Sequence, residues 1–206
     1  SYMKKIFVIF IFFIFYFSNS IANEIKFEKI LGNLNQPWSL SFIDEKNILF
    51  TEKSGKLYYY NLNSKKKIEI NHNLSVLEIG QGGLLDVLYH NKDVYVSYSE
   101  NRGNWRSSTS VGKGKFNINN INFKNIFRAE PPIDSGYHFG SRLVISEQYL
   151  FITSGERGQG MIAQDATKHP GSIIRINLDG SVPNDNPKFT NKKKWLPEIF
   201  QIGVRN

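Results

Sequence analysis

One histidine in this chain of 206 residues lies in a setting that suits chemistry. His138 occurs in the stretch DSGYHFGSRLV (134–144), between aromatic residues and with a glycine two positions away on either side. Histidine has an ordinary pKa near neutrality, so its imidazole can take a proton from a substrate as a general base. Taken alone, a histidine next to aromatic residues is more often structural, and this stretch leaves both roles open.

Two other segments offer partners for this histidine. The segment TSGERGQGMIAQDATKH (153–169) is too long for a hairpin loop, and long loops are usually functional or disordered. In it, Glu156 or Asp165 could orient and charge-pair an imidazole, as carboxylates do for general bases. The final GVRN presents Arg205, whose planar and permanently charged fork suits a carboxylate or quinone oxygen.

Two further polar segments are less definite. EIGQGGLLD (78–86) has three glycines that permit a close backbone approach or a positive φ. It displays Gln81, whose amide both donates and accepts hydrogen bonds, although a flexible turn is the alternative. NLDGSVPNDNP (177–187) loosely resembles a calcium loop, but it lacks the required spacing and the closing glutamate, so it predicts a turn.

Composition excludes several kinds of site. The chain has no cysteine, which rules out disulfides, thiolate metal sites, cysteine nucleophiles and a lipidated cysteine anchor. The formal net charge is +8, but the excess lies in SKKKIE and NKKKW, within Asn-rich turns rather than on a basic helix. Such charge is typical of solvated loops, so we expect no nucleic-acid partner.

The first residues predict a secretory signal peptide over 1–22. Lys4 and Lys5 precede an unbroken apolar run from Ile6 to Phe17, and Ser20 and Ala22 suit a small-residue cleavage site. A membrane anchor is the alternative, but a span takes roughly 20 apolar residues, so we expect no stable span after cleavage. A single domain over 23–206 would then be periplasmic or secreted.

Strands must position the polar segments, because no long stretch has capped helical periodicity. Short strand-like runs recur instead, separated by Gly, Asn, Asp and Ser. Four of them fall within about 35 residues: WSLSFI, NILFTEK, KLYYYNL and KKIEI. The pattern returns in GLLDVLYHNKDVYVSYSE, TSVGKGKFNI and NFKNIFRAE, and again in GSRLVISEQYLFITSGE and GSIIRINLDG.

The repeat predicts a β-propeller. Its starts at Pro37, Gly82 and Gly140 are roughly 45 and 58 residues apart, and about 40–50 residues with four strands each is typical of propeller blades. A β-sandwich of hairpins is the alternative. Two blades and part of a third cannot close a ring, and QIGVRN has no evident strand, so we expect a C-terminally truncated fragment.

Together the motifs are more specific than any one of them. QPWSLSF, TEKSGKLYYY, GQGGLLDV, HFGSRLV, SGERG, AQD, RINLDGSVPNDNP and GVRN resemble, in this order, the soluble quinoprotein glucose/sorbosone dehydrogenases. The chain is similar to the N-terminal part of an aldose sugar dehydrogenase of that family, from about Gln36 to Asn206. The resemblance implies an all-β, six-bladed propeller of four-stranded antiparallel blades, of which this chain covers roughly three to four.

The resemblance also implies an activity and a site. Pyrroloquinoline quinone (PQQ) is the expected cofactor, with calcium bound by the second half of such proteins, so no metal ligand is assigned here. His138 would take the proton of the anomeric hydroxyl while hydride passes to the quinone, Glu156 would support it, and Arg205 would stabilise charge on the quinone oxygen. Gln81, His138, Arg205 and Asn206 would bind the cofactor. The partners would be an aldose and an electron acceptor.

Two departures from the family pattern and two rival functions remain. Val204 stands where a histidine often precedes the final RN, and Ser172 stands where a lysine often follows Gly171. A non-catalytic propeller that binds a sugar or protein partner is the first rival. A propeller lactonase or other calcium-dependent hydrolase is the second, but it would need several acidic residues on the axis, where these loops offer Gln, His and Arg.

Overall fold

The computed structural model describes residues 25–188 and 194–206, in two compact units. In the first unit, Ser1–Gly32, the described residues 25–32 have no regular secondary structure. The predicted signal peptide lies outside the described residues. Among the residues that are described, no helix is long and apolar enough to cross a membrane.

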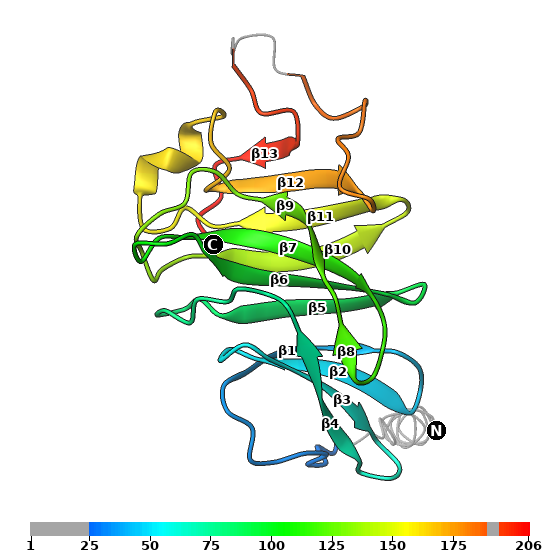
Figure 1. The fold of residues 1–206 in the computed structure, drawn as a ribbon. Coiled ribbons are helices and arrows are strands. Elements are labelled where there is room, and N and C mark those ends of the chain that lie inside the picture. The colour runs from blue at the N-terminus through cyan, green and yellow to red at the C-terminus, as the bar shows by residue number, and fades with distance from the viewer. Residues whose placement is uncertain (1–24, 189–193) are drawn as a thin grey trace, which may run out of the picture. The chain divides into compact units, whose positions relative to one another are not determined.

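The second unit, Asn33–Asn206, contains three sheets that follow one another along the chain (Figure 1). The first consists of β1 (Pro37–Phe42), β2 (Asn47–Glu52), β3 (Lys56–Asn61) and β4 (Lys67–His72), with β8 (Asn120–Ile121) at its edge. The second consists of β5 (Leu84–His90), β6 (Asp93–Asn101), β7 (Ser107–Lys115) and β9 (Lys124–Arg128). The third consists of β10 (Gly140–Ser146), β11 (Tyr149–Ser154), β12 (Ser172–Asn177) and β13 (Ile199–Ile202). A 3-10 helix, η1 (Gly160–Gln164), lies between β11 and β12.

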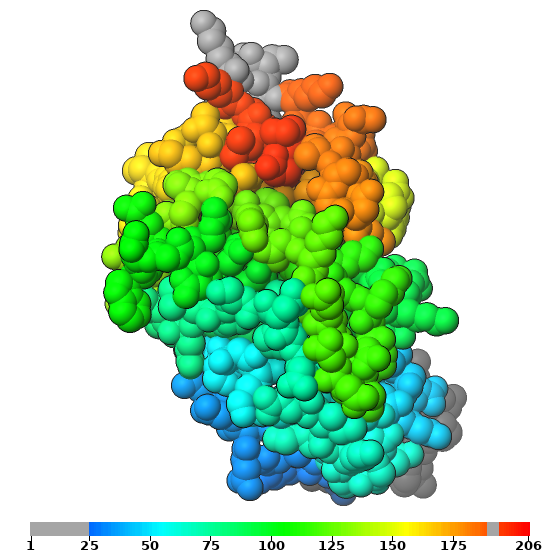
Figure 2. Space-filling view, in the orientation of Figure 1, coloured from blue at the N-terminus to red at the C-terminus, as the bar shows by residue number. Residues whose placement is uncertain are grey.

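The three sheets are consecutive blades of a β-propeller, as the repeat predicted. Each begins with an antiparallel meander of sequential strands, and β5 packs against both β1 and β10, so the first strands of the blades are neighbours. A β-sandwich would instead stack two sheets face to face. In the space-filling view the cyan, green and yellow-to-orange zones of the three sheets adjoin in chain order (Figure 2). The sandwich alternative is therefore wrong.

The prediction that the chain has no terminal strand is also wrong. β13 pairs antiparallel with β12, Ser172 opposite Ile202, and completes four strands in the third blade. This strand is short and separated from β12 by a long connection, so no hairpin pattern marks it. Its Phe200 ring packs edge-on against Phe151 of β11 at 5.4 Å between centroids. The described part of the chain thus holds three blades, rather than two and part of a third.

Two apolar cores join the blades. Strand β6 contributes to both, because successive side chains of a strand point to opposite faces: Val94 and Val96 belong to the core with the first blade, and Tyr95 to the core with the third. Strand β8 leaves the second blade, pairs in parallel with β4, and buries Ile121 in the first of these cores. It therefore covers an edge of the first sheet that would otherwise be unpaired.

A buried carboxylate links the first strands of all three blades. Asp86 of β5 accepts the backbone N–H of Leu143 in β10 at 2.8 Å and the hydroxyl of Ser39 in β1. The Arg142 guanidinium lies 3.3 Å from the same carboxylate and over the Trp38 ring, 4.1 Å from its centroid. Since β10 begins directly after the loop with His138, this contact ties that loop to the other two blades.

We expect Asp86→Asn to destabilise the protein by about 1–3 kcal/mol, because an amide cannot accept all the hydrogen bonds that the buried carboxylate accepts. Urea denaturation of the two proteins measures the difference. Asp134→Asn, at an exposed position, is the matched control and should be near neutral. Equal unfolding midpoints for the wild type and Asp86→Asn would contradict the linking role.

Candidate active site

His138 lies in the loop that enters β10, and hydrogen bonds hold both its side chain and its backbone. Its Nδ1 atom is hydrogen-bonded to Oε1 of Glu156, and the Gln81 amide oxygen accepts the His138 backbone N–H at 2.8 Å. The side chain keeps 19% of its surface exposed. Its Nε2 atom has no hydrogen-bond partner within the described ranges 25–188 and 194–206. One ring nitrogen is therefore anchored, and the other has no hydrogen-bond partner among the described residues.

Glu156, two residues after the end of β11, is suited to orient this imidazole. It is 4% exposed, and its second oxygen accepts the backbone N–H of Gly160 at 2.9 Å. Burial raises the pKa of this carboxyl, but the hydrogen bonds from His138 and Gly160 outweigh burial and hold the pKa below its ordinary value. A charged carboxylate at Nδ1 favours the tautomer whose proton is on Nδ1, which leaves the Nε2 lone pair free to accept a proton.

The last two residues complete the cluster. The carbonyl of Arg205 accepts the Glu156 backbone N–H at 2.8 Å, and its Nε lies 3.9 Å from Glu156 Oε1. The Arg205 side chain is 80% exposed, so most of its fork is open to a ligand. Asn206 accepts the backbone N–H of Gly140 through its side-chain oxygen at 2.9 Å. The five predicted site residues, from four distant segments, are thus linked by direct contacts.

The glycines allow these loops to touch one another. A Cβ atom on Gly155 would lie 2.1 Å from the carbonyl oxygen of His138, and one on Gly80 would lie 2.5 Å from that of Gly136. Distances this short are not found for real Cβ atoms. The close approach that the sequence predicted is therefore between neighbouring loops of the protein itself.

The other carboxylates considered as partners or ligands have structural roles. Asp165 accepts hydrogen bonds from the Thr167 hydroxyl and N–H, which lower its pKa to about 2, and it pairs with Lys168 at 3.0 Å. It does not contact His138, so of the two candidates Glu156 is the partner.

The segment that loosely resembles a calcium loop forms a turn. Asp179 accepts from Ser181 within this turn, as predicted, while Asp185 pairs with Arg175. Within the described part of the chain, no group of three or more His, Asp or Glu could hold a metal ion.

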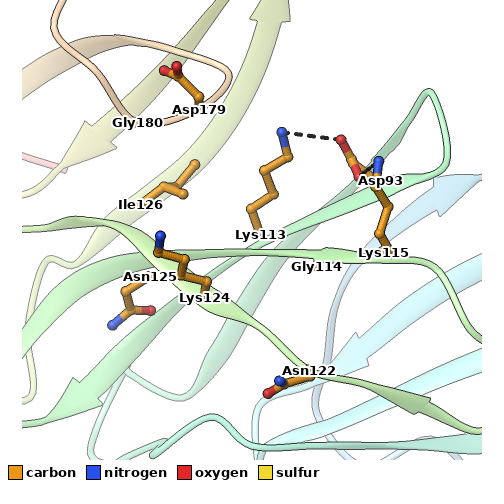
Figure 3. Close-up of a pocket in the computed structure, with 10 residues that line it drawn as sticks. All are labelled: Asp93, Lys113, Gly114, Lys115, Asn122, Lys124, Asn125, Ile126, Asp179 and Gly180. Atoms are coloured by element: carbon orange, nitrogen blue, oxygen red, sulfur yellow. Dashed lines mark ion pairs between the residues drawn. The ribbon is translucent and has the colours of Figure 1, made fainter.

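A cavity of about 460 Å³ lies elsewhere, between β7, β9 and the turn after β12 (Figure 3). Two of its three lysines, Lys113 and Lys115, are already paired with Asp93. It is at the opposite end of β7 from Ser107, which lies beneath the His138 loop. None of the predicted site residues lines it, and we assign it no role in the chemistry.

Sequence reasoning missed Arg157, the neighbour of Glu156. Its side chain is buried and donates to the carbonyl oxygens of Tyr137, Ser107 and Ser135. The loop with His138 therefore packs against this guanidinium. Arg157 stands in the motif SGERG, but the sequence alone does not distinguish a buried arginine from an exposed one.

The pH dependence of stability follows from Glu156. Its folded-state pKa is depressed, so the ionised carboxylate stabilises the fold fully above the unfolded value of about 4.5, and this stabilisation is lost as pH falls through the lower folded value. We expect the difference in unfolding free energy between the wild type and Glu156→Gln to shrink as the pH is lowered from about 6 to 3. Urea unfolding at a series of pH values measures it. Glu45→Gln, at an exposed position, should show no such trend, and a constant difference for Glu156→Gln would contradict the assignment.

Known proteins resemble this chain along most of its length. The family model described as Glucose / Sorbosone dehydrogenase matches residues 34–206. Aldose sugar dehydrogenase YliI of Escherichia coli K12 is 33% identical over 189 residues, covering 87% of this chain and 51% of that protein. Quinoprotein glucose dehydrogenase B of Acinetobacter calcoaceticus is 29% identical over 229 residues, covering 90% and 46%.

The structural comparison agrees. A crystal structure of a glucose dehydrogenase superposes with a TM-score of 0.81 and 34% identity, over 87% of this chain and 55% of that one. The chain therefore spans about half the length of the curated relatives it matches. All five predicted site residues fall within the segment matched by the family model.

Proposed function

Because this chain belongs to the glucose/sorbosone dehydrogenase family, we propose that the complete protein is a PQQ-dependent enzyme that oxidises aldose sugars to lactones. The single observation that carries the proposal is the pair of His138 and buried Glu156, with Nε2 free and Arg205 beside it. We propose that these three blades form half of a six-bladed ring. The protein would act in the periplasm or outside the cell.

The chemistry of the exposed side chains fits PQQ, a flat quinone that bears carboxylates. Arg205 offers a charged fork, and Gln81 and Asn206 offer amide groups around the same histidine. We assign cofactor binding to these three residues and His138. When bound, PQQ supplies the two-electron acceptor for the hydride that leaves the anomeric carbon.

In the proposed reaction the residues of this chain hold and move one proton. His138 Nε2 takes the proton of the anomeric hydroxyl as the C–H bond of the same carbon is broken, so that the carbon becomes a lactone carbonyl. The Glu156 carboxylate at Nδ1 keeps the receptive tautomer and stabilises the imidazolium that results. Arg205 supplies a fixed positive charge where negative charge develops.

The proposal is tested by assaying the full-length protein with added PQQ and calcium. We expect a redox dye to be reduced when glucose or another aldose is added, and not when PQQ is omitted. Calcium is an expectation of the family resemblance, and the same assay with a chelator addresses it. If no aldose gives PQQ-dependent dye reduction, the proposed enzyme activity is refuted and the non-catalytic propeller remains. A lactonase would instead hydrolyse a lactone without PQQ, but His138 and Arg205 do not provide its acidic cluster.

A further inference from the structure

Arg157 is buried directly beneath the loop with His138. It is 2% exposed, and its guanidinium uses all three nitrogens: Nε donates to the Tyr137 carbonyl at 3.1 Å, and Nη1 donates to the Ser107 carbonyl at 2.8 Å. Nη2 donates to the Ser107 hydroxyl at 3.0 Å and to the Ser135 carbonyl. The flat group also stacks on the Phe139 ring, 3.7 Å from its centroid.

The cation is held by dipoles rather than by an opposite charge. Arg157 takes part in no ion pair within residues 25–188 and 194–206. Burial lowers its pKa to about 10, so it remains charged at neutral pH. A buried cation without a carboxylate partner opposes folding unless its hydrogen bonds are satisfied. Here the hydrogen bonds are satisfied, and two of the acceptors, the Tyr137 and Ser135 carbonyls, belong to the loop with His138.

That loop has a backbone conformation that needs support. His138 has φ of +47°, in the left-handed region that residues other than glycine adopt at a cost of about 1 kcal/mol or more. The side chain of Arg157 binds residues 135, 137 and 139, on both sides of His138. Its backbone N–H donates to the His138 carbonyl at 3.2 Å. One residue thus restrains the backbone before, at and after the histidine.

We propose that Arg157 is a positioning residue for the proposed base, which keeps the His138 backbone left-handed so that its imidazole meets Glu156. The catalytic part of this inference rests on the proposed function. Glu156 and Arg157 have complementary roles, because the first orients the imidazole ring and the second fixes the backbone that carries it. A lysine could supply the charge but not the planar fork that reaches four oxygens at once.

The test compares Arg157→Met, Arg157→Lys and the matched control Arg102→Met in the full-length protein. Arg102 lies at the same end of the second blade, where it bonds Glu130 and Ser108 but not the His138 loop. Amide hydrogen exchange of segment 135–141 reports on the loop whether or not the protein is an enzyme. Steady-state kinetics with PQQ and an aldose, with and without deuterium at the anomeric carbon, report on the base.

We expect Arg157→Met to speed exchange in 135–141 and to lower kcat about 10- to 100-fold, with KM for the aldose within about threefold and a larger deuterium isotope effect. Arg157→Lys should fall between this variant and the wild type, and it serves if Arg157→Met does not fold. Arg102→Met should resemble the wild type in both measurements.

Unchanged exchange in 135–141 would overturn the proposal. So would a lower melting temperature with unchanged kcat and isotope effect, because that is the behaviour of a merely structural residue. If the wild-type protein has no PQQ-dependent activity, the proposed function fails separately, and the exchange data alone decide whether Arg157 holds the loop.

Discussion

Replacing His138 with alanine in the complete protein is expected to lower kcat for aldose oxidation about 100- to 10,000-fold, the usual contribution of a general base. Alanine removes the imidazole whose Nε2 atom has no hydrogen-bond partner among the described residues, while the Glu156 carboxylate and the Arg205 fork remain. Binding of PQQ should change much less than kcat, since His138 is one of several groups assigned to it. Dye-reduction kinetics at saturating PQQ and a separate titration of PQQ binding measure the two effects.

A histidine variant far from the site checks that the loss is specific to His138, and it should keep the activity of the wild type. His90→Ala is the matched control, because His90 lies at the far end of β5 from the site and its side chain contacts the neighbouring Asn91. Full activity in His138→Ala would remove the residue from the mechanism.

The blades could be predicted from the sequence because their signals are local. Alternating apolar residues and short turns specify hairpins such as β2–β3, where Lys53, Ser54 and Gly55 form the turn. The same reasoning failed for β13, whose partner β12 precedes it by a long connection, so no turn marks the pairing. β8 was also missed, because a two-residue strand that pairs in parallel with β4 has no pattern of its own.

The candidate site, like the fold, could be predicted only in part from the sequence. Its polar residues could be selected from the sequence, since Gln, His and Arg in glycine-rich loops are unusual for plain hairpins. The residues alone left Glu156 and Asp165 open, and only the family resemblance selected Glu156, because the choice depends on how η1 folds the loop between them. The importance of Arg157 and Asp86 depends on burial and on contacts with distant strands, such as Ser107 in β7 and Leu143 in β10. These are properties of the packed blades rather than of any motif.

Arg205 provides the other large expected effect. We expect Arg205→Met to lower kcat about 100- to 1,000-fold, because a fixed charge or donor at the site where negative charge develops contributes on this scale. Arg205→Lys should recover part of the loss, since a lysine keeps the charge but lacks the bidentate fork. Arg106→Met is the matched control: Arg106 is exposed in the loop between β6 and β7, at the same end of the blades.

The two possible roles of Arg205 separate in the kinetics. If it stabilises the transition state, kcat falls even at saturating PQQ; if it only binds the carboxylates of the cofactor, the dissociation constant of PQQ rises while kcat at saturation is kept. The geometry favours the first role, because its Nε lies 3.9 Å from the carboxylate that also holds His138, so base and cation are fixed to the same anchor. Unchanged kcat at saturating PQQ in Arg205→Met would contradict the electrostatic role and leave cofactor binding as its contribution.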